Sequence, residues 1–170
     1  GVSFPLLSCN LDFSESILAD FWEPNGLEQE RPPHKIFPSI ILEAGGESIG
    51  VVGVTTEELA DISAISGVKI LPALEKTQAE IDRLQAKGIN KIIVLAHLQQ
   101  LRLELQLASQ LQGADIILAG GSDSLLAKAT DRLRSGDTRK GDYPLRVNGK
   151  DGSPVLVVNT SREYTYLGRL

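Results

Sequence analysis

The sequence predicts an α/β fold in which parallel strands alternate with helices. Residues 91–95 and 115–119 form two short apolar runs rich in β-branched side chains, a pattern typical of buried strands. Between them, apolar residues recur every three or four positions from Leu98 to Leu111, which predicts a helix with one buried face. Gly113 follows where a helix commonly ends. A strand, a helix and a strand in this order form a right-handed crossover, so we expect the two strands to be parallel.

The first third of the chain predicts a short strand, a loop and a hairpin. Residues 4–8 are typical of a short strand, and the polar, proline-bearing segment 20–33 predicts a loop. Two strand-like runs at 37–43 and 48–54 flank the glycine pair Gly45-Gly46. Glycines so placed supply the positive φ that a tight turn needs, so we expect a β-hairpin here.

A further crossover helix is expected at 72–87. Three of its apolar residues fall on one helical face: Leu74, Ile81 and Leu84. From 48 to 119 the order of elements is then strand, helix, strand, helix, strand. This βαβαβ alternation indicates a parallel sheet covered by helices.

The C-terminal third is expected to be rich in β-structure. Residues 125–141 are charged and irregular, whereas 143–147 and 155–159 flank a polar, glycine-bearing segment and predict a second hairpin. Alternating side chains at 164–170 predict a last strand.

Composition describes one domain and excludes several partners and sites. A chain of 170 residues can bury one core. Its formal net charge is −5, from 17 Lys and Arg against 22 Asp and Glu, and the interspersed charges argue against nucleic acid or an anionic membrane surface as a partner. The lone Cys9 excludes an intramolecular disulfide and a thiolate metal site. No apolar run reaches the length of a membrane span.

Polar residues follow the two central strands and form the candidate site. The run at 91–95 ends at Ala96-His97, and the loop 120–124, Gly-Gly-Ser-Asp-Ser, follows the run at 115–119. Because parallel strands share one carboxyl edge, where open α/β sheets usually bind ligands, we expect these segments to be neighbours. An imidazole can ligate zinc or manganese or act as an acid or base, and Asp123 is the one good additional donor in the loop.

Several alternatives remain open for these residues. His97 could be a structural residue. A serine nucleophile activated by His97 is a second possibility, but the loop lacks the glycine two positions after the serine that a nucleophile elbow requires. A phosphate cradle is a third, but the loop lacks the lysine of a P-loop. His34 follows two prolines, which exclude a helix, and we expect it at the surface.

Five segments carry motifs of one family. Residues 4–11 are similar to FPxLSANL, 49–56 to IGVIGLTT, 93–98 to VxLSHLG, 116–121 to the start of DxIIGGHxH, and 164–170 to KYLGRL. In this order, and over nearly the whole chain, they resemble the 5′-nucleotidase branch of the calcineurin-like metallophosphoesterases. These motif sequences most resemble those of bacterial, cyanobacterial-type members.

The resemblance implies a four-layer α/β/β/α sandwich in which two metal ions activate water for attack on a phosphate monoester. Residues 1–170 would form the C-terminal half of a single metallophosphoesterase domain, with the motifs that supply most metal ligands lying upstream. Of the family's ligands only His97 carries over, because Ser122 and Ser124 stand where the family has histidine or glutamine. Asp123 would have to compensate.

The resemblance also implies a function. The parent is expected to be an extracytoplasmic (periplasmic or secreted) metal-dependent phosphomonoester hydrolase that acts on nucleotides, in nucleotide catabolism or phosphate scavenging. Its cofactors would be divalent ions of the zinc or manganese class. The 170-residue chain alone should be inactive and metal-free, and copies could self-associate through the surface that the N-terminal half would cover. The alternative is a non-catalytic, degenerate phosphoesterase fold that serves as a binding or scaffold domain.

Overall fold

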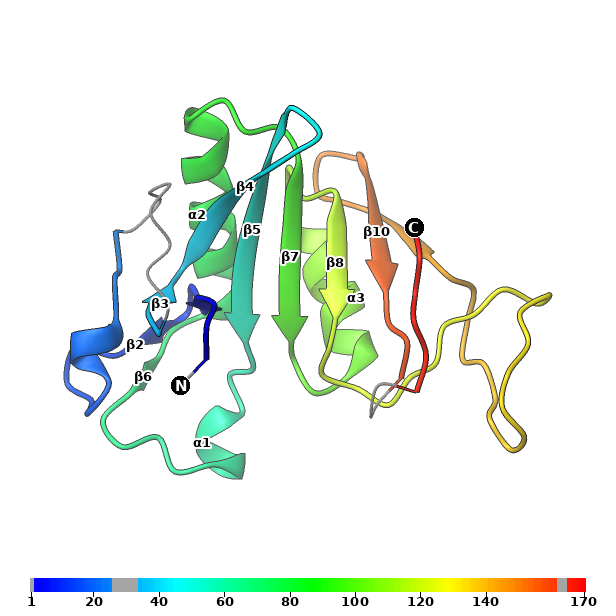
Figure 1. Ribbon diagram of the computed structural model, residues 1–170, viewed down its shortest axis with the longest axis horizontal. Coiled ribbons are helices and arrows are strands. Elements are labelled where there is room, and N and C mark those ends of the chain that lie inside the picture. The colour runs from blue at the N-terminus through cyan, green and yellow to red at the C-terminus, as the bar shows by residue number, and fades with distance from the viewer. Residues whose placement is uncertain (1, 26–33, 162–164) are drawn as a thin grey trace.

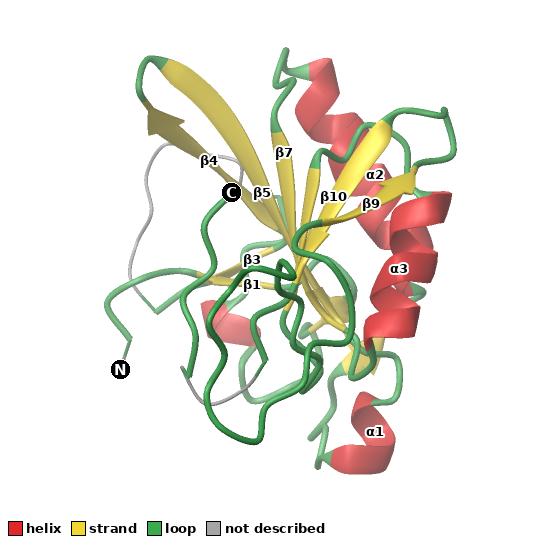
Figure 2. Ribbon diagram, turned by 90° about the vertical axis from the view of Figure 1, so that its right-hand side faces the viewer, coloured by secondary structure: helices red, strands yellow, loops and turns green. Residues whose placement is uncertain are grey.

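The protein consists of a six-stranded sheet with two long helices packed on one of its faces (Figures 1 and 2). A computed structural model describes residues 2–25, 34–161 and 165–170. In order across the sheet, the strands are β4 (Ser39–Ala44), β5 (Glu47–Thr55), β7 (Ile92–His97), β8 (Ile116–Ala119), β10 (Pro154–Val158) and β9 (Leu145–Asn148). The sequence-based prediction of an α/β fold is confirmed.

The centre of the sheet is parallel, as predicted. Strand β7 pairs in parallel with β5 on one side and β8 on the other, and β10 pairs in parallel with β8. The two edge strands, β4 and β9, are antiparallel to their neighbours. The register aligns Thr55 with His97 and Ala96 with Ala119, so the ends of three strands meet at one edge.

Both predicted crossover helices are present. Helix α2 (Ala73–Ala86) and helix α3 (Leu101–Gln110) lie side by side against the sheet (Figure 2). Their apolar residues and alternate strand residues form the main core, which includes the fully buried Ile81, Leu84, Ile92, Leu111 and Ile117. The helix predicted over 98–111 begins three residues later, because Gln99 has a φ of +69° that a right-handed helix excludes.

Both predicted hairpins are confirmed. Strands β4 and β5 are joined by a turn in which Gly45 and Gly46 have φ values of +60° and +81°, the conformation that required glycine. Strands β9 and β10 form the second hairpin.

The short strand predicted at 4–8 is present as β1 (Leu6–Leu7), which pairs with β3 (Ile36–Phe37). Other short elements escaped the sequence analysis, among them β2 (Leu11–Asp12), which pairs with β6 (Lys69–Ile70). A 3-10 helix at Ala19–Phe21 and the four-residue helix α1 (Leu59–Ile62) complete the elements. The last part of the predicted loop, 26–33, lies outside the described residues.

The predicted last strand at 164–170 is wrong. Residues 165–170 form no strand, and Tyr164 lies outside the described residues. Side-chain contacts hold this tail instead of a backbone ladder: the Tyr166 hydroxyl accepts a hydrogen bond from the Arg134 N–H at 2.8 Å and donates one to Asp137 at 2.5 Å. An alternating pattern cannot identify a strand when no sheet edge pairs with it.

The face of the sheet opposite the helices is partly uncovered (Figure 2). Burial alternates along β7, with Ile92, Val94 and Ala96 buried on the helix side and Leu95 and His97 exposed on the other. This open face carries an apolar hollow of about 630 Å³. It is lined by Phe4, Pro5, Leu6, Leu7, Ile40, Leu42, Val51, Ile93, Leu95 and Leu118. Among the described residues, no helix is both long and apolar enough to cross a bilayer.

Close backbone packing at Gly53 generates a stability prediction. A Cβ atom on Gly53 would lie 2.4 Å from the carbonyl O of Leu7, so Gly53→Ala should separate β1 from β5 and lower the free energy of unfolding by about 1–3 kcal/mol. Gly120→Ala is the matched control, because its nearest contact would be 3.6 Å. Urea unfolding measures both variants. Equal stability of the Gly53 variant and the wild type would contradict the packing described.

Candidate functional site

His97 is the last residue of β7 and lies at the carboxyl edge of the sheet. Its side chain is exposed, and strand alternation places it on the open face with Leu95. The sequence-based placement of His97 at a strand exit is therefore correct. His34, by contrast, is an exposed residue outside the sheet, as expected.

The loop after β8 lies directly beside the exit of β7. The Gly120 N–H donates a hydrogen bond to the carbonyl O of Ala96 at 2.8 Å. A Cβ atom on Gly121 would lie 2.4 Å from the backbone N of Gln99, so only glycine fits at this point. The backbones that follow the two strands are thus neighbours, as the crossover argument predicted.

Ser122 helps to build the loop. Its Oγ accepts hydrogen bonds from Asn159 Nδ2 at 2.9 Å and from the Ser124 N–H at 3.3 Å. Asn159 is buried at the end of β10 and also accepts a hydrogen bond from the Ser161 N–H at 2.8 Å. Because both lone pairs of Ser122 Oγ are engaged, the geometry argues against Ser122 as a nucleophile.

The described residues do not by themselves complete a metal site. Asp123 is exposed in the loop, and its carbonyl O accepts a hydrogen bond from Ser161 Oγ at 3.3 Å. Within the described part of the chain, no three His, Cys, Asp or Glu side chains are grouped so as to hold an ion. Stable coordination needs three or more ligands, so metal binding by His97 and Asp123 stays a prediction.

A buried glutamate joins the two strand exits. Glu104 lies in α3 and is 0% exposed, and its Oε1 accepts hydrogen bonds from the N–H groups of Leu98 at 3.2 Å and Gly121 at 3.3 Å. Burial raises the pKa of Glu104 above its ordinary value, and the two N–H groups and the nearby His97 partly offset this rise. Sequence reasoning missed Glu104, although a charged residue among the apolar positions of a helix was a visible signal.

Asn10 fixes the other side of the same edge. Its fully buried side chain donates to the carbonyl O of Thr55 at 2.8 Å and accepts from the Thr55 N–H at 2.9 Å. It also donates to the carbonyl O of Leu71 at 3.3 Å and accepts from Ser8 Oγ at 3.4 Å. Thr55 is the register partner of His97, so Asn10 holds the strand end beside the candidate site.

Comparisons with known proteins find relatives of this chain. No family model matches the chain. The chain is 33% identical over 171 residues to a 5′-nucleotidase of Diplobatis ommata, and the match covers 100% of this chain and 27% of that protein. A 5′-nucleotidase precursor from Thermus thermophilus superposes with a TM-score of 0.73 at 32% identity, covering 89% of this chain and 27% of that one. The Haemophilus influenzae NAD nucleotidase gives a TM-score of 0.72 at 28% identity, over 91% of this chain and 28% of that one.

Over its whole length, the chain is similar to one segment of the 5′-nucleotidases. It spans about a quarter of the length of the relatives that it matches, so it corresponds to one segment of a 5′-nucleotidase. The family resemblance stated from the motifs is confirmed. The departure expected from the motif resemblance lies in the loop 120–124 of this segment, where Ser122 and Ser124 stand in place of histidine or glutamine.

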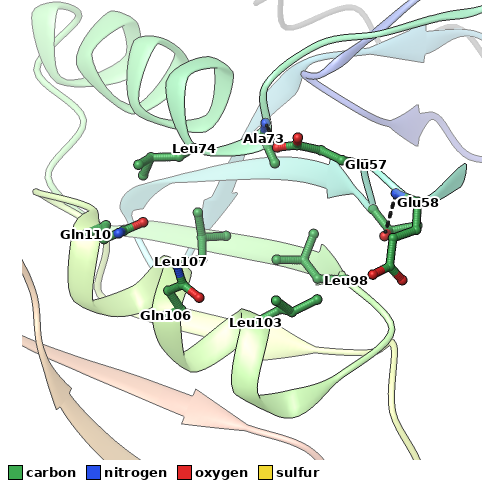
Figure 3. A pocket seen from close by; sticks show the side chains of 10 residues that line it. Glu57, Glu58, Ala73, Leu74, Leu98, Leu103, Gln106, Leu107 and Gln110 are labelled. Carbon is green, nitrogen blue, oxygen red and sulfur yellow. Dashed lines mark hydrogen bonds between the residues drawn. The ribbon is translucent and has the colours of Figure 1, made fainter.

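A separate cavity of about 290 Å³ opens on the helix side of this 5′-nucleotidase segment (Figure 3). Its apolar lining includes Leu74, Leu103 and Leu107, with glutamine and glutamate side chains around them (Figure 3). Glu57 accepts a hydrogen bond from the Ala73 N–H at 2.7 Å and so caps α2. His97 and the loop 120–124 do not line this cavity, so it is separate from the candidate site.

The contribution of the Asn10 hydrogen bonds, which we call the Asn10 clamp, can be tested by substitution. Asn10→Ala would leave the partly buried N–H of Thr55 and the carbonyl of Leu71 without side-chain partners, so we expect the free energy of unfolding to fall by roughly 3 kcal/mol. Asn148→Ala, at an exposed position, is the matched control. Denaturant unfolding followed by circular dichroism gives both values, and a loss no larger than that of the control would show that the clamp contributes nothing.

Proposed function

We propose that the parent protein is a metal-dependent phosphomonoester hydrolase that acts on nucleotides. The observation that carries this proposal is the position of His97, which is exposed at the carboxyl edge of the sheet. The chain that forms this sheet is similar to 5′-nucleotidases over its whole length. Nucleotide substrates fit the names of the relatives, which include 5′-nucleotidases and an NAD nucleotidase. Roles in nucleotide catabolism or phosphate scavenging follow from this chemistry.

In this proposal His97 supplies one ligand to a divalent ion of the zinc or manganese class. Its exposed imidazole has the donor chemistry that these ions accept. Asp123 is the second candidate ligand. Residues other than those that the structure describes would have to complete the coordination. When bound, such ions would activate a water and stabilise the charge on the phosphate.

We further propose that residues 1–170 are the C-terminal half of one metallophosphoesterase domain. The helix-covered face and the open apolar face support this arrangement, because an uncovered sheet face lined by aliphatic residues normally packs against another layer. A second sheet from the same domain would cover it and complete the four-layer sandwich. His97 lies on this face and would then point toward the boundary between the halves.

An extracytoplasmic location, periplasmic or secreted, is part of the same proposal. A relative of known structure is described as a precursor, and another relative, from Naja atra, is a snake venom 5′-nucleotidase. Both descriptions support export.

One observation favours a non-catalytic alternative. Ser122 has no charge to offer an ion, and its Oγ is engaged by Asn159 and Ser124. A loop so built can stabilise the sheet edge without contributing a ligand. The alternative is a degenerate phosphoesterase fold that acts as a binding or scaffold domain.

The complete parent protein distinguishes these two functions. If the enzyme proposal is correct, His97→Ala should lower kcat/KM for a nucleoside monophosphate with added manganese or zinc by at least about 100-fold. His34→Ala is the matched control, because His34 is exposed and outside the sheet. A complete protein without phosphatase activity would favour the scaffold.

The 170-residue chain should not hydrolyse nucleoside monophosphates faster than the added metal alone. Two candidate ligands leave most coordination positions to solvent, so an ion would not be held for catalysis. A phosphate-release assay with zinc or manganese, run beside His97→Ala, measures this. Turnover that the substitution abolishes would mean that other residues of this chain complete a site.

The same chain, studied alone, should form dimers through its open face. Leu95 and Leu118 are adjacent across β7 and β8, and are 37% and 41% exposed. Leu118→Asp would place a charge in the apolar contact and should return the chain to a monomer. Leu74→Asp, at a leucine 36% exposed on the helix side, is the matched control. Light scattering coupled to gel filtration gives the masses; a monomeric wild type at high micromolar concentration would refute self-association.

A further inference from the structure

Three constrained features meet around the exit of β7. Gln99 adopts a φ of +69°, which is uncommon for a residue with a side chain. Gly121 approaches so closely that an added Cβ would lie 2.8 Å from the backbone N of Leu98. Glu104 is fully buried, and its Oε2 has no hydrogen-bond partner within the described protein. Such features persist where the local arrangement itself has a use.

Glu104 differs from the other buried helix glutamate in its surroundings. Glu80, in α2, forms an ion pair with Arg83 and accepts a hydrogen bond from Ser39. Glu104 accepts hydrogen bonds from the backbone N–H groups of Leu98 and Gly121, and no Lys or Arg of the described residues is paired with it. Burying a carboxylate without a cation opposes folding, so stability alone does not account for a glutamate here.

We propose that Glu104 is a positioning residue that holds His97 and the loop 120–124 in a fixed relation. We call its Oε1 and the N–H groups of Leu98 and Gly121 the Glu104 clasp. The proposal rests on the proposed function in one respect, that His97 is the side chain that meets the metal or substrate.

The clasp acts on both strand exits at once. The Leu98 N–H belongs to the peptide bond that follows His97, and the Gly121 N–H belongs to the bond that follows Gly120. One oxygen atom accepts both, at 3.2 and 3.3 Å, and so sets the separation of the two exits. Because α3 packs into the main core through Leu107 and Ala108, the position of Glu104 is tied to that of the sheet.

The test uses nuclear magnetic resonance on the metal-free 170-residue chain. The sequence contains two histidines, so His34 provides an internal reference for the imidazole signals of His97. Glu104→Leu should shift the His97 signals but not those of His34. It should also speed the amide hydrogen exchange of Leu98 and Gly121 at least tenfold.

Two variants separate positioning from general damage. Glu104→Gln keeps an oxygen acceptor and should retain the His97 signals and the slow exchange of both amides. Glu80→Leu removes a buried glutamate from the other helix and should leave the His97 signals in place. If Glu104→Leu does not fold, Gly121→Ala decides, because its methyl group would lie 2.4 Å from the Gln99 N and force the exits apart. It should shift the same His97 signals.

The proposal is overturned if Glu104→Leu, or Gly121→Ala in its place, leaves His97 unchanged. It is also overturned if Glu80→Leu shifts His97 equally, or if Glu104→Gln is as disruptive as Glu104→Leu.

The proposed function can fail separately, because all these measurements are made without metal. In the complete protein, Glu104→Leu should weaken manganese affinity about 10- to 100-fold, with Glu104→Gln close to wild type. A complete protein without phosphatase activity would refute the enzyme while leaving the metal-free results as the test of the clasp.

Discussion

Parallel pairing on both sides of β7 is the constraint on which the rest of the structure depends. It aligns Thr55 with His97 and Ala96 with Ala119, so three chain segments leave the sheet at one edge. It also requires crossover connections, and the helices that provide them bury the same face of all three strands. The location of the candidate site and the location of the core thus have a common cause.

The same constraint leaves the two faces of the sheet unlike. Helix packing reduces the exposure of Val94 and Ile117 to 0%, whereas Leu95 and Leu118, which follow them in the strands, remain more than a third exposed. Burying apolar surface stabilises a protein by roughly 25 cal/mol for each Å² removed from water, and these exposed side chains do not contribute that free energy. Covering the open face would therefore bury further apolar surface of this sheet. His97 lies at the edge of that face.

The main elements were predictable because local pattern determines them. Periodicity predicted α2 and the three central strands, and the pair Gly45-Gly46 predicted the β4–β5 turn through its positive φ. The pattern at 164–170 failed because alternation does not specify a partner edge. Asn10 was out of reach for a related reason: its partner Thr55 is 45 residues away, and no local spacing connects them.

The candidate site contains one residue that the sequence pattern could identify and one that it could not. His97 could be found from its place after a strand, but the role of Glu104 depends on two N–H groups from different loops that only folding brings together. The periodicity of α3 predicts an apolar residue at the inward position that Glu104 occupies, so the hydrophobic pattern gives no indication of its role. Conflict between a residue and its local pattern is informative for this reason. A buried carboxylate in α3, a left-handed glutamine after β7 and a close glycine contact from the loop after β8 meet at this edge of the sheet. These contacts hold the exit of β7 and the loop 120–124 in one arrangement.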